Sequence, residues 1–347
     1  MAIPEIVKIA TDHAFGTKAA GVTIALRDPV EFQSNRLYDL WDGDRHFVAK
    51  EYLQPNEMQV APVREHKTLQ LLSAMDIAPQ PIFFDPSVGP VVIYEYMAGE
   101  MWDRRAATAD DLAALADIWT RISTAPADWF SRAHECYPPQ EMELKFECCV
   151  KDYFEWATAN FKPGVQAAEL CFKVLESRRG AAQELAERPK VLCLCRGDPR
   201  FANVIQRPGG RLGLVDWEDS GLHDPAQEAA DMVLHPNQED LVSWETWQAF
   251  LEPYIGFHSK NDPEVAFRTH LYLAIVPFLW LTVFLQWGMR LASSGRLAGW
   301  AINGLSANAR MRRYMARLLA WPDMRYELAL PCLESLAFFP EEDTHDV

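Results

Sequence analysis

The chain has 347 residues, of which 49% are apolar and 24% are charged, the balance of an ordinary globular protein. This composition excludes a disordered chain, a collagen-like repeat and a coiled coil, and the length suggests two domains of ordinary size. The formal net charge of −16 argues against a general nucleic-acid-binding protein, because an acidic surface repels phosphate backbones. A nucleotide ligand is still allowed, since it needs only a local cationic site.

The sequence shows no targeting or membrane-spanning segment. No basic stretch followed by an apolar core begins the chain, so we expect no signal peptide. The longest apolar run, 271–285, includes Pro277 and is shorter than the roughly 20 residues that a membrane-spanning helix needs. We therefore expect a buried core helix, no membrane insertion and a cytoplasmic location. The seven cysteines lack paired C-x-x-C spacing, which predicts reduced, buried thiols rather than a zinc site or disulfides.

The first hundred residues have the pattern of a β-rich unit. Two runs of β-branched and aromatic residues, 36–41 and 45–52, flank Asp42-Gly43-Asp44, which predicts a β-hairpin. Apolar residues at three-residue spacing then predict an amphipathic helix over 63–75. Two further strands are expected at 81–84 and 90–97.

The rest of the chain is mostly helical. Thr108, followed by acidic residues, predicts a helix start, and helical patterns continue to about residue 187 and again over 224–321. Between them lies a β island, with strands expected at 191–195, 203–206 and 212–216. We therefore predict an α+β protein with a small β-rich domain over 1–97 and a larger helical domain over 98–347.

The β island carries the residues with the clearest chemistry. Asp198 and Asn203 lie on one loop, and Asp216 ends a neighbouring strand. Carboxylate and amide oxygens in this arrangement can hold Mg²⁺, which binds through one or two carboxylates plus substrate phosphates. A carboxylate that is not used for the metal can orient a hydroxyl nucleophile. The simpler interpretation is that both aspartates cap turns, as aspartate often does.

The run from Asp198 to Pro225, D-x-x-x-x-N…D-W-E-D-S-G-x-x-D-P, resembles the aminoglycoside phosphotransferase/choline kinase-like family, a relative of protein kinases. Other segments resemble that family in the expected order over residues from about 20 to 320. They are its nucleotide loop (33–38), strand lysine (Lys50), helix glutamate (Glu65) and inter-lobe hinge (93–97). The P-loop and Rossmann glycine motifs are both missing, as are the G-x-S-x-G and H-E-x-x-H motifs.

This resemblance implies a two-lobed protein-kinase-like fold and transfer of the γ-phosphoryl group of ATP, or of GTP, to a hydroxyl of a small molecule. Asp198 would be the catalytic base. The nucleotide would be contacted by Ser34, Asn35, Lys50 with its ion-pair partner Glu65, and the backbone of Glu95, Tyr96 and Met97. Magnesium would be held by Asn203, Asp216 and Glu218.

One position departs from the family. Arg196 stands where the family usually has a histidine, two residues before the catalytic aspartate. Its guanidinium could pair with a carboxylate such as Asp216 or Glu218. The departure keeps open a second interpretation, a catalytically weak or inactive nucleotide-binding regulatory protein. A third interpretation is a structural interaction module that binds no nucleotide.

The sequence leaves the acceptor and the oligomeric state open. Candidate acceptors are aminoglycosides, amino alcohols such as choline, and sugar-like molecules. Eleven of the twelve tryptophans follow residue 99, and Trp280 and Trp287 would share one helix face. Such rings could line a pocket for a cationic acceptor, although core packing explains them more simply. Arg310, Arg312 and Arg313 would suit an anionic acceptor, but an exposed helix face is the simpler expectation.

Overall fold

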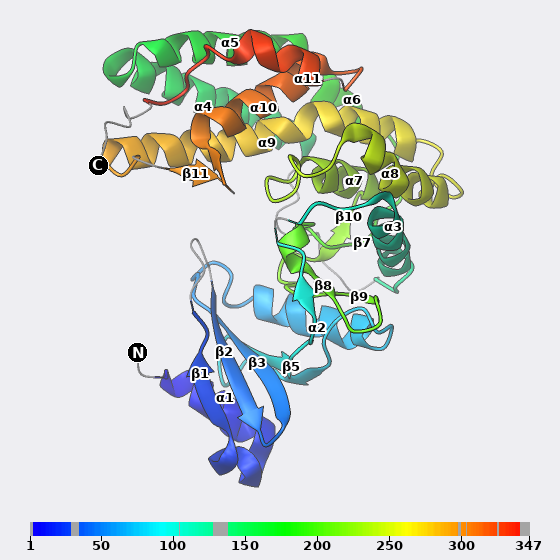
Figure 1. Ribbon diagram of the computed structural model, residues 1–347. Helices are drawn as coiled ribbons and strands as arrows, with labels where there is room; N and C mark the ends of the chain where they lie inside the picture. The colour runs from blue at the N-terminus through cyan, green and yellow to red at the C-terminus, as the bar shows by residue number, and fades with distance from the viewer. Residues whose placement is uncertain are drawn as a thin grey trace. The chain divides into compact units, whose positions relative to one another are not determined.

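The structure, a computed structural model, describes residues 3–28, 35–103, 105–127, 138–297, 300–302, 304–324 and 326–340. The chain forms two units (Figure 1). The first comprises Met1–Arg105, Ala114–Glu135 and Leu192–His223, and the second comprises Ala106–Ala113, Cys136–Val191 and Asp224–Val347. The β island therefore groups with the N-terminal sheet, whereas the domain boundary after residue 97 stays a prediction.

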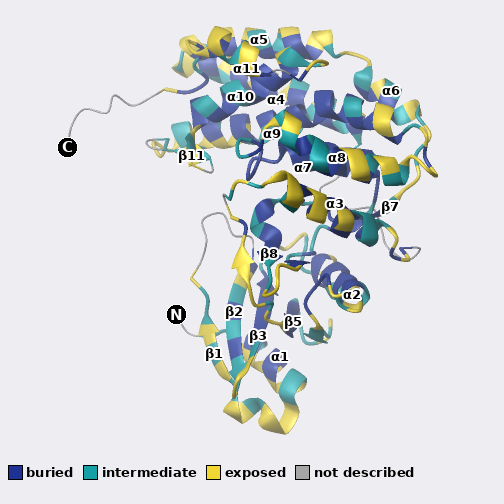
Figure 2. Cartoon of the chain, turned by 45° about the vertical axis from the view of Figure 1, so that its right-hand side comes forward, coloured by how far each residue is buried: buried dark blue, intermediate teal, exposed yellow. Residues whose placement is uncertain are grey.

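The first unit contains a five-stranded antiparallel sheet, in the order β1-β2-β3-β5-β4. Its strands are β1 (Thr23–Leu26), β2 (Asn35–Asp42), β3 (Arg45–Tyr52), β4 (Pro81–Phe83) and β5 (Val91–Glu95). The predicted hairpin is present as β2 and β3, in which Asp42 pairs with Arg45. Gly43 supplies the turn with a φ of 60°, a conformation that costs glycine no steric strain. The middle strand β3 is buried over 47–52 (Figure 2).

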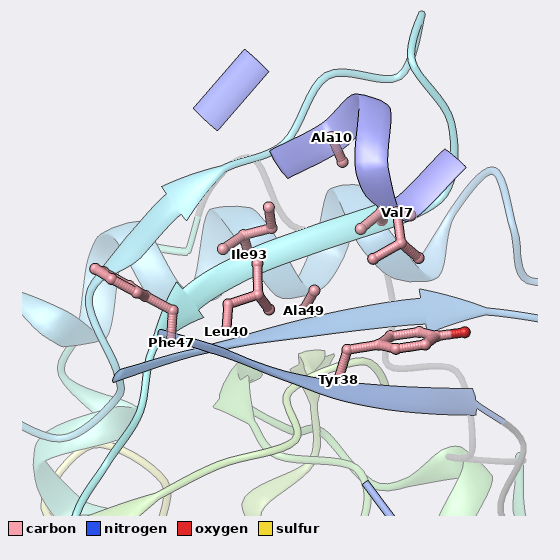
Figure 3. Close-up of a cluster of buried hydrophobic side chains, with 8 residues drawn as sticks. Val7, Ala10, Tyr38, Leu40, Phe47, Ala49 and Ile93 are labelled. Atoms are coloured by element: carbon pink, nitrogen blue, oxygen red, sulfur yellow. The ribbon is translucent and has the colours of Figure 1, made fainter. Parts of the chain in front are cut away.

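Two helices flank this sheet. α1 (Glu5–Phe15) covers one face, and a 3₁₀ segment (Gly16–Gly21) follows it. Val7 and Ala10 of α1 pack on side chains of β2, β3 and β5 (Figure 3). No element was predicted for residues 5–15, so α1 is an addition to the expected β-rich unit. The predicted helix over 63–75 is α2 (Ala61–Ser73), which starts earlier because Pro62 suits a first helical turn.

The strand register fixes which side chains share a face. Residues directly opposite each other in an antiparallel pair point to the same side of the sheet. Lys50 of β3 is opposite Leu37 of β2 and Val92 of β5, whereas its neighbour Ala49 belongs to the core under α1. Lys50 therefore lies on the face of the sheet that α1 leaves uncovered.

The β island forms two small sheets within the first unit. One contains β6 (Glu100–Met101), β8 (Val204–Gln206) and β9 (Leu212–Leu214), and the other pairs β7 (Cys193–Cys195) with β10 (Gly221–His223). The loop between β7 and β8 ends in a 3₁₀ turn (Phe201–Asn203). These strands confirm the expected island, with ends shifted by at most two residues.

The second unit is helical, as expected. Its described elements are α4 (Pro139–Asn160), α5 (Pro163–Ser177), α6 (Ala181–Glu187), α7 (Pro225–Leu234), α8 (Trp244–His258), α9 (Val265–Ser293), the two-stranded β11 (Ala301–Ile302) and β12 (Leu305–Ser306), α10 (Ala307–Ala320), α11 (Tyr326–Ala329) and a 3₁₀ turn (Leu330–Leu333). The helix predicted after Thr108 is α3 (Ala109–Ser123), where Thr108 and Asp111 bond reciprocally to each other's backbone N–H.

The apolar run lies inside α9, which packs against α4, α7 and α10. At 29 residues, α9 is longer than the run and is long and apolar enough to cross a membrane by length and composition. Its most apolar window is 72% buried within the structure, which is the environment of a core helix. The prediction of a buried core helix is confirmed, and the cytoplasmic location stays a prediction.

Buried ion pairs hold the helices of this unit. Asp224 caps α7, accepting from the Ala226 amide, and also pairs with the buried Arg268 at 2.9 Å. Arg310 is fully buried and pairs with Glu239, so the expectation of an exposed arginine face is wrong for this residue.

Cysteine burial also differs in part from the expectation. Cys148 and Cys332 are exposed, whereas Cys149, Cys171 and Cys195 are buried.

Candidate active site

The uncovered face of the sheet presents an ammonium group to the glutamate of α2. The Lys50 Nζ lies 2.8 Å from the Glu65 Oε2, and the two side chains are 3% and 0% exposed. Glu65 also accepts hydrogen bonds from the hydroxyl of Tyr52 and, at 3.3 Å, from the backbone amide of Trp217. The expected ion pair is therefore present and buried, which distinguishes it from an exposed pair of little energetic value.

Two further carboxylates from the loop after β9 meet the same ammonium. Lys50 donates to Asp216 and lies 3.1 Å from the Glu218 Oε2. Burial alone would lower the pKa of Lys50, but Asp216, Glu65 and Glu218 together raise that pKa well above its usual value. Lys50 is therefore firmly cationic, as a phosphate-binding group requires.

The pKa values of the two loop carboxylates, Asp216 and Glu218, shift in opposite directions. Burial would raise the pKa of Asp216, but Lys50 and Arg200 outweigh it and hold that pKa below its ordinary value. The pKa of Glu218 rises to about 7, mainly because of burial, although Lys50 opposes the rise. Asp216 is thus the more firmly anionic of the two.

Contacts from α2 and β2 fix the 216–220 loop. Arg64 donates to the Glu218 carbonyl, and the hydroxyls of Thr68 and Ser220 lie 2.7 Å apart. Asn35, the first residue of β2, donates to the Glu218 carboxylate at 2.6 Å. The predicted nucleotide contact Asn35 therefore lies beside this loop, whereas Ser34 falls outside the described residues.

The loop between β7 and β8 brings the expected catalytic aspartate to the same place. The Asn203 amide donates to the Asp198 carboxylate at 3.3 Å. Arg200, on the same loop, spans Asp198 and Asp216, with its Nε 3.1 Å from Asp198 and its Nη2 3.2 Å from Asp216. Sequence reasoning missed Arg200. Its place between Asp198 and Asn203 was the available signal.

Arg196 connects the two loops through their backbone carbonyls. It is 1% exposed, and it donates to the backbone carbonyls of Asp198 at 2.9 Å and Asp216 at 2.8 Å, as well as to that of Val215. Its guanidinium also lies 4.7 Å from the ring centroid of Trp217. The acceptors that we identify are carbonyls rather than the carboxylates suggested by the sequence. Because the carbonyls belong to Asp198 and Asp216 themselves, Arg196 ties the backbones of both residues together.

The predicted hinge, residues 93–97, includes the end of β5 and the two residues after it. The amides of Glu95 and Tyr96 donate to the carbonyls of Gln80 at 2.9 Å and His46 at 3.0 Å. Within the described residues we find no hydrogen-bond partner for the Met97 amide. Met97 is therefore the hinge residue whose amide is available to a bound base.

The donor atoms of this cluster suit a hard divalent cation. Single oxygens of Glu65, Asp216 and Glu218 lie within 4.8 Å of one another, and the ammonium of Lys50 lies among them. Magnesium prefers oxygen ligands of this kind over nitrogen and sulfur. The Asn203 amide nitrogen donates to Asp198, and its amide oxygen offers a further ligand of the same kind. The residues present therefore fit a magnesium ion.

In the second unit, Trp280 lies beside an acidic group and a histidine. The Trp280 Nε1 donates to Asp231 at 3.0 Å, and the His235 ring packs edge-on at 4.8 Å. Trp287 is 39% exposed. These contacts are compatible both with core packing and with a pocket for a cationic group, so the two alternatives from the sequence remain.

Residues 29–264 match the model of a family described as the phosphotransferase enzyme family. No curated protein matches the sequence. Among solved structures, the chain is similar to choline kinase LicA from Streptococcus pneumoniae, with 19% identity, a TM-score of 0.61, and 91% of this chain and 99% of that chain covered.

Two other solved structures show the same likeness. A choline/ethanolamine kinase family protein from Mesorhizobium loti is 18% identical, with a TM-score of 0.56 and coverage of 94% and 98% of the two chains. The gentamicin complex of APH(2")-IIa is 14% identical, with a TM-score of 0.58 and coverage of 94% and 99%. At such identities the likeness shows the fold, which confirms the predicted kinase-like α+β architecture.

Proposed function

Because the chain belongs to the phosphotransferase enzyme family, we propose that it transfers the γ-phosphoryl group of ATP to a hydroxyl of a small molecule. The observation that carries this proposal is the joint placement of Lys50, Asp198 and Asp216. Lys50 is fixed by Glu65 and donates to Asp216, and Arg200 connects Asp216 to Asp198. An anchored cation, a metal-binding carboxylate and a hydroxyl-orienting carboxylate are what phosphoryl transfer needs.

The residues have distinct roles in the proposed reaction. Lys50 binds the α- and β-phosphates, and the Met97 amide receives the base. Asp198 orients the acceptor hydroxyl and takes its proton. Asp216 and the Asn203 amide oxygen hold magnesium, with Glu218 as a third ligand. Bound there, the metal neutralises phosphate charge, and most of the remaining catalysis is positioning.

The inactive regulatory protein has less support. That interpretation depended on Arg196 in place of the usual histidine. In the structure, Arg196 donates hydrogen bonds to the carbonyls of Asp198 and Asp216. This contact favours a working loop, because the guanidinium that replaces the histidine fixes the backbones of both aspartates.

Nucleotide titration with and without magnesium tests the proposal. Isothermal titration of ATP, and in parallel GTP, should show binding that strengthens with Mg²⁺ in the wild type. Asp216→Ala should lose the magnesium effect while remaining folded, because Asp216 contributes charge and little packing. Magnesium-enhanced binding that persists unchanged in Asp216→Ala would refute the assigned metal site.

The acceptor is the second unknown. The likeness to choline, ethanolamine and aminoglycoside kinases suggests amino alcohols and aminoglycosides, with sugars as a third class. A Mg·ATP phosphorylation screen across these classes should give one class of phosphomonoester. ADP formation with none of them, despite nucleotide binding, would favour the regulatory protein.

A further inference from the structure

Arg200 differs from the other cations of the site in how it is held. Lys50 is 3% exposed and surrounded by three carboxylates, and Arg196 is 1% exposed and bonded to three carbonyls. Arg200 is 42% exposed and touches only the carboxylates of Asp198 and Asp216 among the described residues. Its Nε makes no well-aligned hydrogen bond there, although it lies 3.1 Å from Asp198.

These contacts contribute little to the fold. Partly exposed ion pairs are worth about 0–1 kcal/mol, because solvent screens them and ordering the side chains costs entropy. Arg196 already joins the two loops through their backbones. A structural need for Arg200 is therefore weak, and its position calls for another explanation.

The two carboxylates that Arg200 spans mark the two ends of the proposed transfer. Asp198 lies where the acceptor hydroxyl is oriented, and Asp216 lies where the metal and the nucleotide phosphates are held. During transfer, the bond from the γ-phosphorus to the β–γ bridging oxygen breaks, and ADP leaves with the bonding electrons. A bond from the phosphorus to the acceptor oxygen forms, and the acceptor proton passes to Asp198. A guanidinium that reaches both aspartates lies beside this path.

We propose that Arg200 is a further catalytic residue that clamps the transferred phosphoryl group, an inference that rests on the proposed function. Its forked donors leave the two aspartates when metal and acceptor engage them, and donate to the equatorial phosphoryl oxygens. Guanidinium matches this geometry because it offers parallel donors to planar oxygen groups. The contact strengthens as charge spreads over those oxygens in the transition state, so it accelerates transfer rather than ground-state binding.

The test uses MgADP with fluoroaluminate, a planar mimic of the transferred group, measured by isothermal titration on the full chain. The wild type should bind MgADP more tightly when fluoroaluminate is present. Arg200→Gln should bind MgADP alone as the wild type does, but lose about 10²–10³-fold of the fluoroaluminate tightening, the usual cost of removing one preorganised donor. Arg200→Lys should recover part of that tightening, because it keeps the charge without the fork.

Arg211→Gln is the matched control. Arg211 belongs to the same unit and pairs with an exposed aspartate, Asp76, so its removal should leave the tightening intact. Equal melting temperatures of the four proteins would confirm that folding is unaffected.

The outcomes separate the two proposals. If the wild type fails to bind MgADP at all, the proposed function is wrong. If the wild type binds MgADP but fluoroaluminate does not tighten that binding, the proposed role of Arg200 is wrong and the nucleotide site stands. The same conclusion follows if Arg200→Gln keeps the full fluoroaluminate tightening.

Discussion

At the scale of single residues, Asp216 shows how the site holds a conformation that its backbone disfavours. Its φ of 67° lies in the left-handed region, which aspartate tolerates better than most residues but at a cost. Lys50 binds its carboxylate, and Arg196 binds its carbonyl. These two contacts hold the conformation from both ends of the residue, a pattern typical of functional positions.

The buried ion pair predicts a large stability effect. Lys50→Met removes the cation that pairs with the fully buried Glu65 and leaves its charge uncompensated. We expect unfolding free energy to fall by about 3–5 kcal/mol, as for other broken buried pairs. Urea denaturation measures it. Lys8→Met, which breaks the exposed pair with Glu5, should cost less than about 1 kcal/mol. Equal losses in the two variants would contradict the burial argument.

Glu218 predicts a pH dependence of stability. Burial raises its pKa in the folded protein to about 7, above its ordinary value near 4.5, so the folded state binds the proton more tightly than the unfolded state. The contribution of Glu218 to the free energy of unfolding is therefore complete below pH 4.5 and is lost as pH rises to about 7. It amounts to at most about 3 kcal/mol.

Glu218→Gln removes the titrating group, and its melting temperature should show a smaller decline between pH 5 and pH 7 than that of the wild type. Thermal unfolding at fixed ionic strength measures the difference. Parallel pH profiles for the two proteins would mean that Glu218 is not held in its protonated form by burial.

Residue types predicted the candidate catalytic cluster more readily than the residues that support it. Asp198, Asn203 and Asp216 stood out because their oxygen chemistry and spacing suit a metal. Arg196 and Arg200 did not, since an arginine near two aspartates has many geometries. Whether such an arginine binds carbonyls or carboxylates depends on the fold of both loops.

At the scale of helices and strands, local sequence patterns predicted those elements that local interactions determine. The hairpin needs only a turn glycine and two β-forming runs, so its presence and the place of its turn followed from the sequence. The length of α9 did not follow from its apolar run, because polar residues at both ends also join the helix. α1 was missed because its stability comes from packing on β2, β3 and β5, which lie far along the chain.

Two helical glycines give a matched test of helix packing in the second unit. A Cβ built on Gly288 of α9 would lie 2.0 Å from the Phe339 ring, whereas one on Gly256 of α8 meets nothing within 4 Å. Gly288→Ala should therefore destabilise the protein by about 1–3 kcal/mol through overpacking. Gly256→Ala should stabilise it by up to about 1 kcal/mol, because alanine favours helix.

Chemical denaturation of the two variants measures both effects. Stabilisation by Gly288→Ala would mean that the Phe339 ring moves aside at no cost, and that α9 does not need a glycine there.

At the scale of the whole molecule, the order of segments carried most of the functional prediction. A lysine strand, a glutamate helix, a hinge and an aspartate-rich island follow one another, and the fold brings Lys50, Glu65, Asp198 and Asp216 into one unit. The acceptor could not be predicted this way, because no local motif in the sequence identifies the side chains that would bind it. The family match shows a phosphotransferase, and the acceptor class rests on experiment.

Phosphorus NMR of Mg·ATP with the acceptor panel tests the central claim most directly. The wild type should convert ATP to ADP and one new phosphomonoester. Asp198→Asn should still bind Mg·ATP but lower kcat by about 10²–10⁴-fold, because an amide keeps the shape and cannot accept the hydroxyl proton. Product formation at the wild-type rate in Asp198→Asn would contradict the account, since Asp198 would then have no part in the transfer.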